Sequence, residues 1–112
     1  MDAEEHTELV LRVVEQVPPG RVTTYGAIAG VVGGGPRRVA AVMSRDSEGL
    51  PWWRVVRSDG TLPPHLWERA GAEYAVERTP LRAAARDGSR PVDVSAAFWS
   101  PPVPEPLVPP PG

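Results

Sequence analysis

The stretch VTTYGAIAGVVGGGPRRVAAVMSR, residues 22–45, constrains the fold more than any other part of the chain. Small apolar residues between about 24 and 32 recur at helical spacing, which predicts a short helix. Thr23 or Thr24 can cap this helix, because a threonine hydroxyl accepts a hydrogen bond from an amide of the first turn. The three glycines at 33–35 then provide a tight turn, since glycine readily adopts positive φ.

A second helix is predicted directly after this turn, over residues 36–45. Pro36 suits the first position of a helix, where no amide hydrogen is needed. The helix opens with Arg37 and Arg38. Two helices joined by a short glycine turn form the pattern of a helix-turn-helix, a motif that binds DNA.

The rest of the chain adds few elements. Valines and leucines at helical spacing predict an amphipathic helix over 7–17. We expect a mainly α fold with a small β hairpin, a winged helix-turn-helix-like DNA-binding domain spanning residues 1–98. The proline-rich segment 99–112 is expected to be a flexible tail. The remaining predicted elements are a hairpin or wing over 50–62 with its turn at RSDG, a helix over 65–77 and a loose hairpin around Asp87 and Gly88.

Composition excludes several classes of protein. The chain has no cysteine, which excludes disulfides, thiolate metal sites and a cysteine nucleophile. His6 and His65 lie far apart without a cysteine partner, so we expect no metal and no cofactor, and we place His6 at the surface. No run approaches the roughly 20 apolar residues of a membrane span, and the acidic N-terminus is unlike a secretory signal. We therefore expect a cytoplasmic protein with no membrane partner.

The charge is unevenly distributed. The net charge is −2, yet residues 17–62 carry six arginines against three acidic residues. Local potential, rather than total charge, attracts phosphates, so this segment favours a nucleic-acid partner.

Two catalytic or nucleotide-binding interpretations are weak. GGGPRR lacks the lysine and Ser/Thr of a phosphate-binding P-loop. Ser58, Asp59 and His65 could be read as a hydrolase triad, but no nucleophile elbow is present and Asp59 is better explained by a tight turn.

The motifs resemble a known family. VPPGRVTTYGAIAGVVGGGPRRVAAVMS followed by LPWWRVVRSDGTL resembles the DNA-binding domain of the O6-alkylguanine-DNA alkyltransferases, and more closely the alkyltransferase-like proteins. The resemblance covers residues 8–82. In the repair enzymes a Pro-Cys-His-Arg-Val stretch carries the cysteine that accepts the alkyl group, whereas Trp52 and Trp53 replace Cys and His here. Indole cannot act as the acceptor, so the resemblance implies a protein that is not an enzyme.

The resemblance also implies roles for residues that contact DNA. Tyr25 matches the tyrosine that helps to rotate the target nucleotide out of the duplex. Arg37, six residues before Met43, matches the arginine that fills the space of the extruded base, with Arg38 as the other candidate. Thr23 and Thr24 are expected to contact phosphates.

A pocket for the flipped alkylguanine is implied around the tryptophans. Trp52 is expected to form one side of it, with Arg54 and the backbone of Val55 shaping it and His65 near its lip. Tyr25 and Trp53 are also expected to belong to this pocket, and Trp53 is expected to pack against the core as well.

The leading hypothesis is a monomeric sensor that binds O6-alkylguanine in double-stranded DNA, flips it, and recruits nucleotide excision repair. The alternatives are a winged-helix regulator that reads undamaged sequence in the major groove, an enzyme such as a glycosylase or degenerate alkyltransferase, and a domain that has lost DNA binding.

Overall fold

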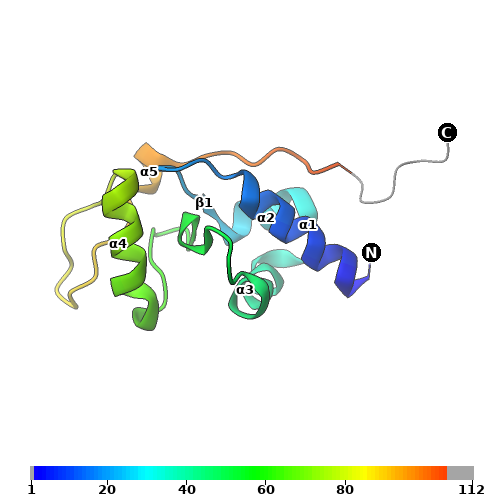
Figure 1. The fold of residues 1–112 in the computed structure, drawn as a ribbon, viewed down its shortest axis with the longest axis horizontal. Helices are drawn as coiled ribbons and strands as arrows, with labels where there is room; N and C mark the ends of the chain where they lie inside the picture. Colours follow the sequence, from blue (N-terminus) through cyan, green and yellow to red (C-terminus); the bar gives the residue numbers. More distant parts are fainter. Residues whose placement is uncertain (1, 106–112) are drawn as a thin grey trace.

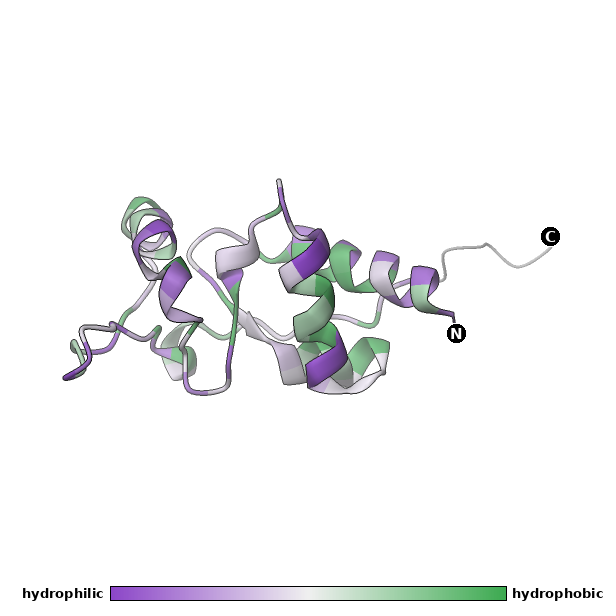
Figure 2. Ribbon diagram, turned by 90° about the horizontal axis from the view of Figure 1, so that it is seen from below, coloured by the Kyte–Doolittle hydropathy of each residue, from purple (hydrophilic) through white to green (hydrophobic). Residues whose placement is uncertain are grey.

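Three helices form one half of the molecule, as a computed structural model describing residues 2–105 shows (Figure 1). They are α1 (Ala3–Gln16), α2 (Tyr25–Val32) and α3 (Gly35–Asp46). The predicted apolar faces meet between them, which confirms the helical part of the fold. The buried cluster contains Leu9, Val10, Val13, Val14, Ile28, Val32, Val39, Val42, Met43 and Val55. In Figure 2 the apolar segments gather where these helices meet.

α1 begins earlier than the spacing of its valines predicts. Asp2 caps the helix by accepting a hydrogen bond from the Glu5 amide at 2.8 Å. The extra turn places His6 on the same face as Val10 and Val13, because residues three to four apart share a helix face. His6 is 1% exposed and its Nε2 lies 2.9 Å from the Gly33 carbonyl oxygen. The prediction that His6 is a surface residue is therefore wrong.

The glycine turn between α2 and α3 forms as predicted. Thr24 caps α2, since its hydroxyl oxygen accepts a bond from the Ala27 amide at 3.0 Å. Gly34 has a φ of +86°, and a Cβ on it would lie 2.6 Å from Nε2 of His6. Both the backbone angle and the close approach of α1 require glycine here. The turn is thus held against α1, and it fixes the direction in which α3 leaves.

The predicted hairpin over 50–62 is wrong. β2 (Val55–Val56) instead pairs in parallel with β1 (Thr23–Thr24), with Thr23 opposite Val55. The RSDG turn does form, since the Arg57 amide donates to the Thr61 carbonyl at 3.0 Å. After the turn the chain bonds elsewhere: the Val92 amide donates to the Gly60 carbonyl. The small β element is therefore a two-stranded parallel sheet that joins the helix-turn-helix to the centre of the chain.

α4 (Trp67–Glu77) follows a single 3-10 turn, η2 (Pro64–Leu66), and covers a second core. The segment after α4 forms the predicted loose hairpin, with an antiparallel bridge between Leu81 and Val92. A short helix that the sequence did not predict, α5 (Val94–Ala97), follows it. The second core contains Val22, Val56, Leu62, Ala70, Tyr74, Val92 and Ala97.

The chain after α5 returns to the first half of the molecule. The Trp99 amide donates to the Val22 carbonyl at 2.7 Å, and the Trp99 ring packs against the first core. Pro101 is buried. Packing therefore continues beyond residue 98, and residues 106–112 of the predicted tail lie outside the described residues. Across residues 2–105 no helix has the length and apolar character to cross a bilayer.

Candidate nucleic-acid interface

A cavity of about 680 Å³ opens between α3, residues 52–54 (the tryptophan segment) and the start of α4. Its lining brings together residues from four separate parts of the sequence. They include Tyr25, Arg37, Met43, Trp52, His65 and Arg69. Four of the predicted site residues therefore share one cavity.

Trp52 is one of the residues that line this cavity. It belongs to a 3-10 helix, η1 (Trp52–Arg54), and its half-buried ring packs against both cores. Its ring meets that of Trp53 edge-on, with centroids 5.7 Å apart and planes at 87°. The guanidinium carbon of Arg69 lies 5.3 Å from the Trp52 ring centroid. Adjacent residues of a β-strand point to opposite faces of a sheet. Because residues 52–54 form a helical turn instead, this restriction does not apply to the two neighbouring indoles.

Trp53 packs into the second core, as expected. Its indole Nε1 donates to Oε1 of Glu77 at 3.1 Å, and the Tyr74 hydroxyl donates to the Trp53 carbonyl at 2.6 Å. Both contacts come from α4. Trp53 thus anchors the tryptophan segment to that helix, and it does not line the cavity.

Arg54 is directed away from the cavity. Its Nε donates to both carboxylate oxygens of Glu77, at 3.0 and 3.1 Å, and Nη2 forms an ion pair with the same group. Its Nη1 donates to the Val17 carbonyl at 2.9 Å. Val55 is fully buried in the first core. The structure thus separates both residues from the cavity lining and places them behind Trp52, where they fix the segment in position.

The carboxylate of Glu77 holds this arrangement together. Burial acts to raise the pKa of Glu77, but the hydrogen bonds from Arg54, the Gly20 amide and Trp53 outweigh it and keep the pKa below its ordinary value. Glu77 is therefore ionised at neutral pH. Its charge neutralises the Arg54 guanidinium, which is also largely buried.

The residues at the start of α2 differ in what they can reach. Thr23 is fully buried and the hydroxyl of Thr24 is occupied by its cap, whereas Tyr25 lines the cavity. Burial raises the pKa of the Tyr25 hydroxyl, and the nearby positive charge of Arg57 opposes this only in part. The hydroxyl stays protonated at neutral pH and can donate a hydrogen bond to an anion.

The two arginines of α3 also differ. Arg37 and Arg38 are both exposed in the first turn of the helix, but only Arg37 lines the cavity. His65, on η2, is exposed and lines the same cavity. These placements distinguish Arg37 from its neighbour, which the sequence left as alternatives.

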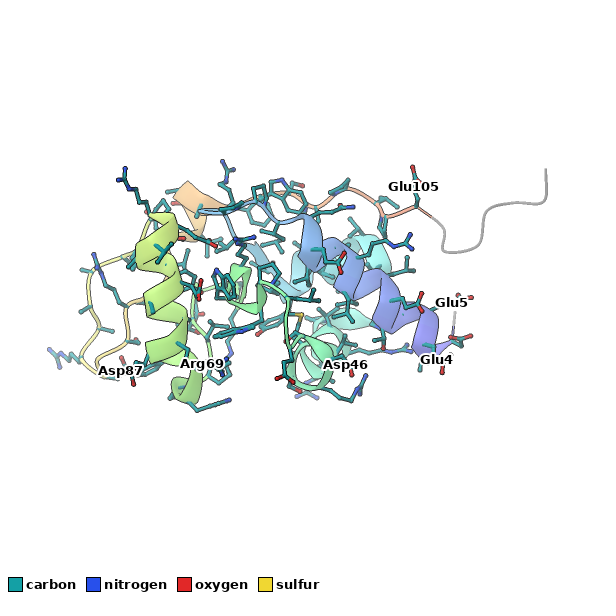
Figure 3. The ribbon with its side chains drawn as sticks, in the orientation of Figure 1. Glu4, Glu5, Asp46, Arg69, Asp87 and Glu105 are labelled. Atoms are coloured by element: carbon teal, nitrogen blue, oxygen red, sulfur yellow. The ribbon has the colours of Figure 1, made fainter. Side chains whose placement is uncertain are left out.

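Sequence reasoning missed three arginines of the cavity: Arg45, Arg57 and Arg69. Arg69 follows His65 by four residues, the spacing that brings two side chains to one face of a helix, and this was the available signal. Figure 3 shows Arg69 on the side of α4 that faces α3. Within residues 2–105 no cluster of three His, Asp or Glu side chains could hold a metal ion.

Residues 5–81 match the family model described as the DNA-binding domain of 6-O-methylguanine DNA methyltransferase. The chain belongs to this family. A curated relative of the family, the DNA base-flipping protein of Escherichia coli strain K12, is 34% identical over 97 residues, which cover 81% of this chain and 71% of the relative. The methylated-DNA–protein-cysteine methyltransferase of Methanothermobacter thermautotrophicus is 43% identical over 58 residues, covering 50% of this chain and 33% of that protein.

Solved structures place the chain with the alkyltransferase-like proteins of the family. The crystal structure of S. pombe Atl1 in complex with damaged DNA containing O6-carboxymethylguanine matches with a TM-score of 0.79 and 26% identity. The match covers 90% of this chain and all of that one. A second Atl structure from S. pombe, in complex with DNA, matches with a TM-score of 0.77 and 25% identity. These matches confirm the predicted fold, a helix-turn-helix DNA-binding domain like that of the alkyltransferase-like proteins.

Proposed function

We propose that this protein is a non-enzymatic sensor that binds O6-alkylguanine in double-stranded DNA by flipping the damaged nucleotide into the cavity beside Trp52. The observation that carries this proposal is the position of Trp52. The residue that replaces the acceptor cysteine presents its indole to a cavity of about 680 Å³, which Tyr25 and Arg37 also line. An aromatic face in a cavity suits the stacking of an extruded base.

The named relatives support recognition of alkyl damage. The E. coli relative is a DNA base-flipping protein, and S. pombe Atl1 was crystallised with DNA that contains O6-carboxymethylguanine. Base flipping takes the target base out of the stack and into a pocket of the protein. We expect the same recognition of a flipped base at the cavity described above.

Each residue of the interface has a distinct task in this mechanism. Tyr25 donates its hydroxyl to the phosphate of the target nucleotide and drives its rotation. Arg37, which is exposed and lines the cavity, enters the space that the base leaves and so offsets part of the lost stacking. Trp52 receives the flipped base. Arg38, exposed beside Arg37 in the first turn of α3, contributes a phosphate contact that helps to hold the duplex.

Alkyl transfer does not follow binding. The whole chain contains no cysteine, and an indole carbon or nitrogen is no substitute for a thiolate in displacing guanine from an alkyl group. Trp53, in the position of the activating histidine, is held by Glu77. The lesion therefore remains intact in the complex.

A lesion that is bound but unrepaired requires a second system to remove it. We propose that the complex passes the lesion to nucleotide excision repair, in the cytoplasm, and that one protein molecule acts at one lesion. The family resemblance suggests this repair partner. One lesion occupies one cavity, so a second molecule of the protein is not needed.

The flipping mechanism is tested with three variants and a duplex that holds one O6-methylguanine. We expect Tyr25→Ala and Arg37→Ala each to weaken lesion binding by about 10- to 100-fold, because flipping costs a few kcal/mol that these side chains offset. Arg86→Ala, an exposed arginine outside the cavity, is the matched control and should bind nearly as the wild type does. Circular dichroism verifies that each variant is folded. Wild-type affinity in both Tyr25→Ala and Arg37→Ala would refute flipping.

A further inference from the structure

A second cavity, with a volume of about 650 Å³, lies against the face of α4 that is opposite to Arg69. The helix contributes Trp67, Gly71, Tyr74 and Arg78 to its lining. These residues follow one another at intervals of four, three and four positions, so they lie along one face of the helix. Arg69 lies two positions from both Trp67 and Gly71, and the pitch of the helix turns it to the other face.

The second cavity is separate from the cavity beside Trp52. Leu62 is the only residue within 2–105 that lines both. In Figure 1, α3 and the segment 82–90 lie on opposite sides of α4. A base that enters beside Trp52 therefore leaves the second cavity free for another ligand.

The second cavity joins an apolar wall to a basic rim. Leu62, Trp67 and Leu81 line it, and all three pack in the second core. Arg78 and Arg90 also line it, and both are exposed. Neither arginine forms an ion pair within residues 2–105. Apolar surface with a few charged groups at its edge is the usual composition of a ligand site.

Positive charge dominates the chain around this cavity. The segment 78–90, RTPLRAAARDGSR, contains four arginines and one acidic residue, Asp87. Oδ1 of Asp87 accepts hydrogen bonds from the amide and the hydroxyl of Ser89, at 2.9 and 2.6 Å. Glu68 is the one acidic residue of the described lining. The local potential therefore favours an anionic ligand.

The two arginines of the rim are set in place by the backbone. Arg78 ends α4 at a φ of +58°, the left-handed conformation that glycine or asparagine usually adopts at this position. A side chain costs conformational energy there, which indicates a role for the arginine beyond ending the helix. Nε of Arg90 donates to the Arg82 carbonyl at 3.1 Å, which holds this guanidinium beside the cavity.

We propose that the second cavity binds an acidic segment of a partner protein, with one apolar side chain in the cavity and carboxylates at Arg78 and Arg90. A guanidinium presents a planar fork of N–H donors that matches the two oxygens of a carboxylate. Phosphates of a duplex could pair with the same arginines but would leave the apolar wall uncovered, so the cavity favours a peptide. The inference goes beyond the proposed function and does not depend on lesion binding.

The test uses three fluorescein-labelled peptides of about 12 residues and measures fluorescence anisotropy at fixed salt. Each peptide carries four aspartates around a central leucine, phenylalanine or tryptophan, and each has a neutral counterpart with asparagine for aspartate. At least one acidic peptide should bind saturably below about 1 mM, and about tenfold more tightly than its neutral counterpart. A duplex with O6-methylguanine, added first, should leave this affinity unchanged.

Two variants fill the cavity and leave the charges in place. A Cβ on Gly71 meets no atom within 4 Å, so Gly71→Leu extends into open space and should weaken peptide binding by about tenfold or more. Ala75→Leu, one turn further along α4 and also in the lining, is the second filling variant. Circular dichroism verifies that both are folded.

The arginines are tested by removing one charge at a time. Arg78→Asn and Arg90→Gln should each weaken peptide binding by about threefold, the effect of an exposed ion pair. Arg78→Asn should also raise Tm, because asparagine suits the left-handed conformation; a purely structural arginine would not combine higher stability with weaker binding. Arg12→Gln removes an equal charge from the exposed face of α1 and should bind as the wild type does.

The outcomes separate this inference from the proposed function. It is overturned if no acidic peptide binds saturably up to about 1 mM, or if the neutral peptides bind equally well. Unchanged binding in both Gly71→Leu and Ala75→Leu overturns the assignment to the cavity. Arginine substitutions that weaken duplex binding but not peptide binding assign the surface to nucleic acid instead. Preference for O6-methylguanine over guanine is measured without peptide, so the sensor stands or falls on that titration alone.

Discussion

The ion pair between Arg54 and Glu77 fixes the segment that carries Trp52, and we expect Glu77→Gln to destabilise the protein strongly. The two side chains are 14% and 7% exposed. The carboxylate also accepts the Trp53 indole N–H at 3.1 Å and the Gly20 amide at 3.0 Å. A single substitution therefore affects contacts between α4, the tryptophan segment and the loop after α1.

The magnitude follows from the burial of the partner. Breaking a buried ion pair by removing one charge costs about 3–5 kcal/mol, because the other charge stays buried without compensation. The glutamine oxygen can still accept one or two of the existing hydrogen bonds, so the lower end of this range applies to Glu77→Gln. A loss of about 3 kcal/mol lowers Tm by about 12–24 °C in a domain of this size.

Thermal and urea unfolding, followed by circular dichroism and tryptophan fluorescence, measure this loss. Glu73→Gln, four residues earlier on α4, makes the same chemical change outside the ion pair and should stay within about 0.5 kcal/mol of the wild type. The double variant Arg54→Met/Glu77→Leu should be more stable than either single variant, because no charge is left buried. A free energy of unfolding for Glu77→Gln equal to that of Glu73→Gln would refute the reasoning.

Three further predictions concern acid, glycine and salt. The pKa of Glu77 lies below its ordinary value of 4.5 in the folded protein. Its stabilising contribution is therefore complete above about pH 4.5 and is lost as the pH falls through the lower folded pKa. Urea unfolding between pH 6 and 3 should show a shallower decline of the unfolding free energy with falling pH in Glu77→Gln than in the wild type. Gly60→Ala places a Cβ 2.1 Å from the Val92 carbonyl oxygen at a φ of +84° and should lower the free energy of unfolding by about 3 kcal/mol or more. Gly71 lies in open space within α4, so Gly71→Ala should raise the free energy of unfolding by about 0.5–1 kcal/mol in the same assay. Affinity for DNA should fall linearly with salt on logarithmic axes, and Arg38→Ala should reduce the slope by about 0.9 if Arg38 contacts one phosphate; an unchanged slope would contradict that contact.

The helix-turn-helix could be predicted from sequence because its signals are local. A threonine cap, a run of small apolar residues, three glycines and a proline each act within one or two turns of backbone. The structure places the cap at Thr24 and the turn at Gly33–Gly35. The absence of an acceptor cysteine could also be inferred from the sequence, since it depends on residue type alone.

The hairpin prediction failed because strand partners are chosen by tertiary contacts. Val55 and Val56 have strand character, and the Asp59–Gly60 turn exists, but β1 occupies the pairing that the hairpin would have used. A two-residue strand carries too little pattern to identify its partner. The parallel pairing joins parts of the chain 32 positions apart, which no local signal reveals.

Long-range polar contacts also explain the misplaced side chains. His6 is buried because the turn 27 residues away offers it a carbonyl, and Arg54 turns from the cavity because Glu77 lies 23 residues ahead. For Arg69 the tertiary fold has the opposite effect, because it brings to the cavity a residue that the sequence did not assign to it. Arg69 reads as an ordinary exposed helix arginine in the sequence, and only the folded chain brings it over Trp52.

The central claim is that the cavity beside Trp52 distinguishes alkylated from normal guanine. It is tested most directly by titrating the protein, at one fixed salt concentration, into two duplexes of identical sequence, one with a single O6-methylguanine and one with guanine. The account predicts clearly tighter binding of the lesion, with the methyl group still on the DNA after the complex is dissociated. Equal affinity for the two duplexes would contradict it and would favour a regulator that reads undamaged DNA.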